Sequence, residues 1–453
     1  MLRTLPLLIA LVLGLAACTP PAPPPAAEPP LAPGACPSAA SLQAPPSFAP
    51  GEIIVRFRPG VSLQSLQGLS VAGVELQQVR PLGQAFLYRA PLDPAQTLAA
   101  LRILRARSEI AYAHPNYLLS AQAVTPNDTL YPSQRWHYQA LRLPEAWEIE
   151  RGYTHPVTVA VVDSGIVAAH PDLADKLLPG YDFYSDACTS GDGDGRDPNP
   201  EDTGPNTTYH GSHVSGLIAA ATNNGQGVAG VSWGARILPL RALSGARGTL
   251  SDVIDALRWA AGLGVTGVPP NRNPAQVINL SLGVEMPCNE LPALQEALQE
   301  VNSRGVIVVV AAGNYNAEAS TLSPASCPGV IVVGATEASG RRAYYSNYGT
   351  RVDLMAPGGD DRQQQWVVST LGRDQYGRYQ YGGMVGTSMA APQVAGVVAL
   401  MKSKRYSLTR EEVLSILKAT ARPLTAEECN RPSGAECGAG LVDARAALER
   451  LGP

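Results

Sequence analysis

The sequence predicts an α/β fold around a mostly parallel sheet, and two observations lead to that prediction. Short, almost continuously apolar runs recur along the chain: VTVAVVD (157–163), QVINLSLG (276–283), VIVVVAAGN (306–314) and GVIVVGAT (329–336). Between them lie segments with apolar residues at helical spacing, such as SDVIDALRWAAGLG (251–264) and LPALQEALQEVNSRG (291–305). Apolar strands that alternate with helices are typical of a parallel sheet that helices cover on both faces.

Polar residues end two of these runs and are the first candidates for chemistry. Asp163 ends the first run and Asn314 ends the third. In parallel sheets of this kind, binding sites lie beyond the carboxyl ends of the strands. A carboxylate at a strand end is partly desolvated and needs a partner, although it could also cap the following turn.

The N-terminal part of the chain has a different character. GEIIVRFRPG alternates apolar and polar residues and ends in a Pro-Gly turn, which indicates a strand. AQTLAALRILRARSEIAYAHPNY has helical spacing followed by an extended end. Residues 51–119 are therefore predicted to form a small α+β domain. Residues 19–50 are rich in proline, which predicts an extended, semi-rigid linker.

Residues 1–18 have the pattern of an export signal. Arg3 precedes an apolar stretch over residues 5–17 that is too short to span a bilayer comfortably. The sequence LAAC matches a bacterial lipobox, in which Cys18 would be lipidated, and an ordinary signal peptide cut nearby is the alternative. We expect an exported protein whose attachment to a membrane is a lipid at Cys18.

Charge and cysteine content narrow the class of protein further. The formal net charge of the 453-residue chain is −4 and no basic run stands out, which argues against a nucleic-acid partner. Apart from Cys18 the chain has an even number of cysteines, which favours disulfides in an exported protein.

Three residues far apart in the sequence have the chemistry of a nucleophilic triad. His210 lies in YHGSHVSG, and Ser388 lies in GTSMAAPQVAGVVAL, a turn that opens an apolar helix. A serine hydroxyl needs a base to take its proton, and histidine suits that role when a carboxylate such as Asp163 fixes its tautomer. The chain order Asp, His, Ser is known for this geometry, and the amide of Asn314 is suited to stabilise an oxyanion.

Several motifs resemble those of the subtilisin-like serine proteases, the subtilases. They are VAVVDSGI, HGSHVSGLIAA, NLSLG, VVVAAGN, YYSNYG, DLMAPGG and GTSMAAPQVAG. The resemblance implies a three-layer α/β sandwich with a central, mostly parallel sheet over residues 127–447. It also implies a serine endopeptidase that needs no catalytic cofactor, with Asp163, His210 and Ser388 as the triad and Asn314 as the oxyanion donor.

The same resemblance implies how a peptide substrate is bound. INLSLG and LSGARGTLSD match the segments that flank the substrate, and the residues concerned are Ser281, Leu282, Gly283, Leu243, Ser244 and Gly245. The peptide would be held as an added strand, so that backbone hydrogen bonds give affinity and side-chain pockets give selectivity. The small, apolar cleft segments favour broad specificity. Departures from the family pattern, at Ser212, Ser215 and Gln393, fall outside the catalytic positions.

GEIIVRFRPG and IAYAHPNYLL resemble the start and the end of the inhibitor-like propeptide of exported subtilases. Residues 51–119 would then assist folding, inhibit the enzyme intramolecularly and be cut off within residues 120–126. Cleavage would release the mature enzyme, expected to be a monomer, from its linker and its lipid. By similarity to extracellular members, two disulfides are implied: Cys288–Cys327 and Cys429–Cys437. Loss of Cys36 with the propeptide would leave Cys188 unpaired.

The loop DACTSGDGDGRDPNPED is rich in carboxylates, which are ligands that calcium prefers. It does not follow the EF-hand pattern, because Arg196 stands at the third ligand place. A structural calcium ion near Asp192, Asp194 and Asp197 is one interpretation, and a solvated surface loop is the other.

Three other functions are weighed against the endopeptidase. A catalytically inactive subtilase used as a binding module would lack a triad residue or Asn314, and all four are present. An esterase of the α/β-hydrolase class needs a G-x-S-x-G motif and the order Ser, Asp, His. A zinc hydrolase built on His210 and His213 needs a third ligand, which no nearby Glu or Cys supplies.

Overall fold

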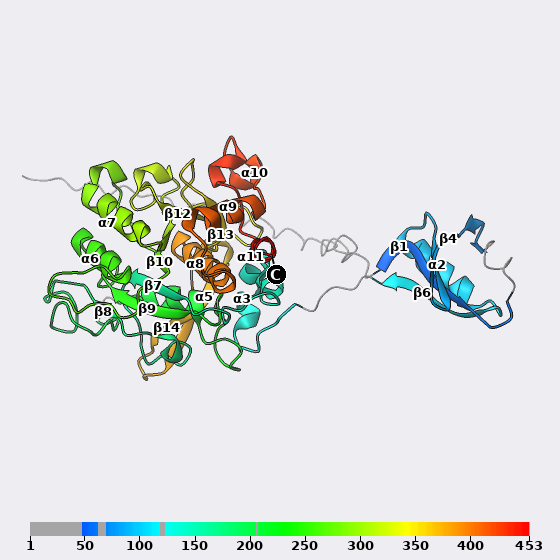
Figure 1. Cartoon of the computed structure of the whole chain (residues 1–453), viewed down its shortest axis with the longest axis horizontal. Coiled ribbons are helices and arrows are strands. Elements are labelled where there is room, and N and C mark those ends of the chain that lie inside the picture. Colours follow the sequence, from blue (N-terminus) through cyan, green and yellow to red (C-terminus); the bar gives the residue numbers. More distant parts are fainter. Residues whose placement is uncertain (1–47, 62–68, 118–122, 205–206, 453) are drawn as a thin grey trace, which may run out of the picture. The chain divides into compact units, whose positions relative to one another are not determined.

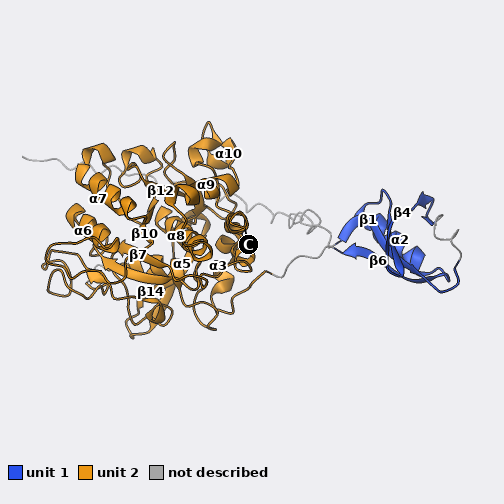
Figure 2. Cartoon of the chain, in the orientation of Figure 1, with its two compact units in different colours: residues 1–120 blue, residues 121–453 orange. Residues whose placement is uncertain are grey.

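The computed structural model describes residues 48–61, 69–117, 123–204 and 207–452. The chain divides into two compact units, residues 1–120 and residues 121–453, called here the smaller and the larger unit (Figure 2). The proposed signal, Cys18, Cys36 and most of the proline-rich linker lie outside the described residues. Among the helices of the described ranges, none has the length and apolar character needed to cross a membrane.

The smaller unit is an antiparallel sheet with one helix packed against it. The sheet has the strand order β4-β5-β1-β6. Its elements are β1 (Phe48–Phe57), β4 (Gln77–Leu82), β5 (Ala85–Arg89), β6 (Ile110–Tyr117) and α2 (Pro94–Arg105), with a separate ribbon of β2 (Ser70–Val71) and β3 (Val74–Glu75). A capping box at Asp93 and Gln96 starts α2. Alternate residues of β1, such as Ile53 and Val55, pack against Leu101 of α2 in a small core.

A wholly parallel, seven-stranded sheet forms the centre of the larger unit. Its strands are β7 (Thr158–Asp163), β8 (Tyr181–Asp182), β9 (Arg236–Arg241), β10 (Val277–Leu280), β11 (Ile307–Ala311), β12 (Val330–Thr336) and β13 (Leu354–Pro357). The order across the sheet is β13-β12-β11-β10-β7-β9-β8, and the paired strands run parallel. The predicted α/β fold is confirmed, and the four apolar runs are β7, β10, β11 and β12.

Helices cover this sheet, with α6 and α7 on one side and α5 and α8 on the other (Figure 1). The larger unit contains the helices α3 (Tyr131–Ala140), α4 (Leu143–Ala146), α5 (His210–Ala219), α6 (Leu250–Ala260), α7 (Pro292–Ser303), α8 (Thr387–Lys404), α9 (Arg410–Thr420), α10 (Ala426–Cys429) and α11 (Ala444–Glu449). Short 3-10 turns are η2 (Ala174–Lys176), η3 (Cys288–Glu290), η4 (Ala319–Thr321), η5 (Asp361–Gln363) and η6 (Gly434–Cys437).

Helix α8 passes through the interior and carries the serine of the predicted triad. Apart from Gln393, Lys402 and Lys404, its residues are apolar or small on every side, which is typical of a fully buried helix. Every residue of α8 except Ser388 and Lys404 is buried. The buried helix therefore holds Ser388 in place while leaving it partly accessible at one end.

An antiparallel hairpin of β14 (Val367–Arg373) and β15 (Tyr379–Met384) leads into α8 and packs against α5. The structure also contains both implied disulfides, Cys288–Cys327 and Cys429–Cys437. Cys188 is a free, exposed cysteine.

Candidate active site

Asp163 and His210 meet at the edge of the sheet. Asp163 is the last residue of β7, and His210 is the first residue of α5. The Nδ1 atom of His210 lies 2.8 Å from Oδ1 of Asp163, which is fully buried and also accepts a hydrogen bond from the Ser164 N–H at 2.7 Å. A carboxylate in this position holds the proton on Nδ1, so that Nε2 of His210 is free to act as a base.

The surroundings of His210 favour its charged form. Burial by itself lowers the pKa of the imidazole, but the negative charge of Asp163, its hydrogen bond and the charge of Asp202 outweigh burial. The pKa of His210 is therefore raised above its ordinary value of 6.5. A protonated His210 ring is thus stabilised by the carboxylates of Asp163 and Asp202.

Ser388 is the second residue of α8 and lines the same cleft as His210. Its hydroxyl donates a hydrogen bond to the carbonyl of Ser281 at 3.2 Å. The Ser281 hydroxyl in turn donates to the carbonyl of Ser388 at 2.9 Å. Ser388 is thus held against the residue that follows β10, and its hydroxyl would have to leave the Ser281 carbonyl in order to donate to His210 Nε2.

Asn314 lies just beyond β11 with the orientation of its amide fixed. Its Oδ1 atom accepts hydrogen bonds from both the N–H and the hydroxyl of Thr387, each at 2.9 Å. These bonds leave the Nδ2 group available to another acceptor. A Cβ atom built on Gly386 would lie 3.4 Å from Asn314 Nδ2, 3.7 Å from Asn314 Oδ1 and 3.6 Å from the Ser388 backbone N, so the Asn314 amide and the Ser388 N–H border the same small space.

A cleft of about 1080 Å³ brings the predicted residues together. It is lined by His210, Asn314, Ser388, Ser281, Leu282, Gly283, Leu243 and Gly245, with Leu250, Leu291, Met384 and Trp366 among the others. A smaller cavity of about 390 Å³ next to it is lined without charged side chains, by residues that include Ala311, Gly313, Tyr315 and Leu322. Unlike Leu243 and Gly245, Ser244 is not among the residues that line the cleft. Its hydroxyl donates to the Thr189 carbonyl at 2.7 Å.

His213 has a different environment from His210. It is fully buried, and its Nε2 atom lies 3.0 Å from the carbonyl of Val367 and 3.1 Å from that of Gly382. Burial and the neighbouring charge of His210 lower the pKa of His213 to about 3. A neutral ring that donates to two carbonyls of the hairpin connects α5 to β14 and β15.

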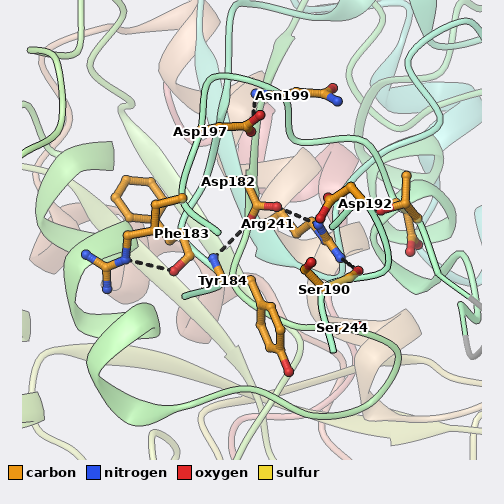
Figure 3. A network of polar contacts seen from close by, with 12 residues as sticks. Asp182, Phe183, Tyr184, Ser190, Asp192, Asp197, Asn199, Arg241 and Ser244 are labelled. Carbon is orange, nitrogen blue, oxygen red and sulfur yellow. Dashed lines mark hydrogen bonds and ion pairs between the residues drawn. The ribbon is translucent and has the colours of Figure 1, made fainter. Parts of the chain in front are cut away.

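The acidic loop before α5 is organised by an arginine (Figure 3). Arg241 ends β9, is fully buried, and contacts Asp182 at 2.5 Å and Asp192 at 2.6 Å while donating to the Ser190 carbonyl. Burial raises the pKa of Asp192, but the hydrogen bond from Ser190 and the charge of Arg241 outweigh it and lower that pKa to about 2.

These contacts do not fit the calcium interpretation of the loop. Asp192 is paired with Arg241, and Asp197 accepts a hydrogen bond from the Asn199 N–H at 2.8 Å. Across the described ranges, no group of three or more His, Cys, Asp or Glu side chains is placed to hold a metal ion. The predicted calcium near Asp192, Asp194 and Asp197 thus receives no support from the arrangement of this loop.

Two residues close to His210 were not predicted from the sequence. Asp202 is almost fully buried, and its Oδ2 atom accepts a hydrogen bond from the Ser164 hydroxyl at 2.8 Å. Ser164 follows Asp163 directly in the sequence, and this position could have indicated that its side chain lies near His210. Asp202 is one of several acidic residues in a loop for which a solvated surface position was one interpretation. Nothing in the sequence distinguished it from the other acids of that loop.

Comparisons with known proteins show the family to which the chain belongs. The model of the subtilase family matches residues 154–437. An extracellular protease of Xanthomonas campestris pv. campestris is 42% identical over 378 residues, which are 79% of this chain and 62% of the relative. An extracellular basic protease of Dichelobacter nodosus is 40% identical over 415 residues, which are 85% of this chain and 66% of the relative. The chain thus spans slightly less than two thirds of the length of each of these two relatives.

A solved structure described as proteases from Pseudoalteromonas arctica is similar with a TM-score of 0.66 and 41% identity. The similarity covers 72% of this chain and 99% of that one. Because the family model matches more than half of the chain and the solved relative is covered almost completely, the chain belongs to the subtilase family.

Proposed function

We propose that this protein is an exported serine endopeptidase in which Asp163, His210 and Ser388 form the catalytic triad. The observation that carries the proposal is the 2.8 Å contact between His210 Nδ1 and Asp163 Oδ1, in a cleft that Ser388 and Asn314 also line. A buried carboxylate behind a histidine at the mouth of a cleft is the arrangement that general-base activation of a serine requires.

In the proposed mechanism, Ser388 Oγ attacks the carbonyl carbon of a peptide bond. His210 Nε2 takes the hydroxyl proton, and Asp163 stabilises the imidazolium that results. His210 then gives that proton to the nitrogen of the leaving amine, and the C–N bond breaks to leave an acyl-enzyme on Ser388. Water hydrolyses the acyl-enzyme with His210 again as the base.

The oxyanion of the tetrahedral intermediate would occupy the space between Asn314 Nδ2 and the backbone N of Ser388. Support comes from Thr387, whose two hydrogen bonds to Oδ1 keep the Asn314 amide from turning over. Donors fixed in advance stabilise the developing charge without a cost of reorganisation during the reaction.

Substrate would lie as an extended strand between Ser281–Gly283 and Leu243–Gly245. Backbone pairing of this kind recognises any extended peptide, and side-chain pockets then supply selectivity. The smaller cavity beside Asn314 has no charged side chain among its lining residues. We therefore propose broad specificity with a preference for uncharged side chains next to the cleaved bond.

The protein would be made as a zymogen. In this proposal residues 1–18 direct export, Cys18 carries a lipid, residues 19–50 form a tether, and residues 51–119 are an intramolecular inhibitor. Support comes from the compact fold of the smaller unit, which has its own core, and from the extended strand β6 at its end. Cleavage within residues 120–126 would release a monomeric enzyme comprising residues 127–447.

Self-processing provides the test. Residues 19–453 and the same chain with Ser388→Ala are produced side by side and followed on a denaturing gel. The active chain should shorten by the mass of the propeptide and linker, while the Ser388→Ala chain should keep its full length. Equal shortening of both chains, or of neither, would contradict self-processing by Ser388. Labelling of the protein by a fluorophosphonate, at a rate that zinc chelators do not change, would exclude the metal hydrolase.

A further inference from the structure

We propose that Asp202 is a second carboxylate of the active site, which positions the start of α5 through Ser164 and adds a negative charge beside His210. The inference rests on the proposed function, because it assigns to His210 the role of general base. It makes Asp202 a positioning residue, since its side chain acts through Ser164 and its charge and does not contact the reacting atoms.

Asp202 is held as a buried acceptor. Only 5% of its surface is exposed. Its Oδ2 atom accepts from the Ser164 hydroxyl at 2.8 Å, and its Oδ1 atom accepts from the hydroxyl of Thr207. The backbone N–H of Tyr209 donates to the same Thr207 hydroxyl at 3.3 Å. Asp202 therefore orders the residues that lead directly into His210.

Ser164 connects the two carboxylates to the first turn of α5. Its backbone N–H donates to Asp163, and its hydroxyl donates to Asp202 while accepting from the Gly211 N–H at 3.0 Å. Gly211 follows His210, and a Cβ atom at Gly211 would lie 2.1 Å from the carbonyl oxygen of Gly165. The start of α5 and the turn after β7 thus approach too closely for any residue larger than glycine at position 211, and this close approach holds His210 next to Asp163.

The charged and titratable groups around His210 come from four elements. Asp163 ends β7, Asp202 lies in the loop before α5, His213 lies one turn further along α5, and Arg241 ends β9 beside Asp163. The fields of both carboxylates raise the pKa of His210, while His213 is neutral near pH 7. Arg241 acts on Asp202, whose carboxylate it stabilises.

Asp202 is itself balanced between two protonation states. Burial, with a smaller contribution from the charge of Asp163, raises the pKa of Asp202 to about 6, even though the hydrogen bonds from Thr207 and Ser164 and the charge of Arg241 favour the carboxylate. An ionised Asp202 stabilises the imidazolium of His210. His210 therefore loses its proton, and becomes a neutral base, only at a higher pH. Protonation of Asp202 removes that stabilisation, so His210 and Asp202 should titrate as a coupled pair.

The test uses the full-length chain with Ser388→Ala, in which no cleavage can occur, and follows the His210 imidazole by NMR against pH. The resonance is assigned from its absence in a His210→Gln variant. Asp202→Asn keeps an acceptor for Ser164 but removes the charge. Glu201→Gln is the matched control, since Glu201 is adjacent in sequence and its side chain accepts instead from the Ala168 N–H at 3.1 Å.

The His210 midpoint should move to lower pH in Asp202→Asn and stay at the parental value in Glu201→Gln. Equal midpoints in Asp202→Asn and the parent would overturn the proposal, as would an equal shift in Glu201→Gln. The readout needs no protease activity. If processing by Ser388 failed while the midpoint shifted, the proposed function would fall and the coupling of Asp202 to His210 would stand.

A second measurement covers the case in which Asp202→Asn does not fold. In the Ser388→Ala parent, the titration curve of His210 should be broader than that of a single independent proton, because Asp202 changes its charge near pH 6. A curve that fits one independent proton over pH 4–9 would contradict the coupling without any further variant.

Discussion

Histidines at the edge of the cleft and in the interior beneath it differ in the protonation state that their surroundings favour. His210 and His213 lie on the same helix, yet two carboxylates raise the pKa of His210 while burial and His210 itself lower the pKa of His213 to about 3. His210 faces the cleft, and His213 donates to the carbonyls of Val367 and Gly382. The contrast teaches that partners from distant strands, not the spacing of two histidines, decide their chemistry.

The largest effect is expected at the cleft edge, for His210→Ala. Without a base, Ser388 keeps its proton, and the rate of peptide hydrolysis should fall by about 10⁴-fold or more. Self-processing should stop, and kcat/KM for a chromogenic peptide should be measured on enzyme whose propeptide is removed by a second protease. His213→Ala is the matched control. Comparable losses in both variants would break the contrast between the two histidines.

Asn314→Ala should have the next largest effect on activity. Loss of one oxyanion donor typically lowers kcat by about 10²–10³-fold, with little change in KM. Steady-state kinetics on the processed variant separates the two parameters. A rise in KM at constant kcat would show that Asn314 binds the substrate and does not stabilise its transition state.

In the interior, Arg241→Met should mainly affect stability. Removing one partner of a buried ion pair leaves Asp182 uncompensated, at a cost of about 3–5 kcal/mol in the free energy of unfolding. Denaturant unfolding in the Ser388→Ala background measures that cost without autolysis. Arg258→Met is the matched control, because Arg258 and Glu300 form an exposed pair worth less than about 1 kcal/mol. Equal costs for the two variants would contradict the assigned role of Arg241.

His213→Ala should lower the free energy of unfolding by about 2–3 kcal/mol, because two carbonyls lose their donor and a cavity opens in the core. Thermal unfolding in the Ser388→Ala background provides the measurement. The same substitution in the active chain should still allow self-processing. An unchanged unfolding transition would mean that the contacts between α5 and the hairpin contribute nothing.

Much of this contrast could be predicted from the sequence, and the reasons differ between residues. The apolar runs that became β7 and β11 are buried strands, so Asp163 and Asn314 at their ends stood out. Strand β9 was not predicted, because RILPLR has an arginine at each end and contains a proline. The arginine at its end, Arg241, can nevertheless be buried because it pairs with the carboxylates of Asp182 and Asp192. The buried place of Asp202 was hidden for the same reason, since pairing with distant residues leaves no local pattern.

The most direct test of the central claim is the mass of the purified enzyme after treatment with a fluorophosphonate. With the propeptide removed from every variant by a second protease, the proposed triad predicts one adduct on Ser388, formed at an undiminished rate in His213→Ala and abolished in His210→Ala. An adduct that formed in His210→Ala at the rate of the unmodified protein, or that mapped to another serine, would contradict the claim that His210 activates Ser388.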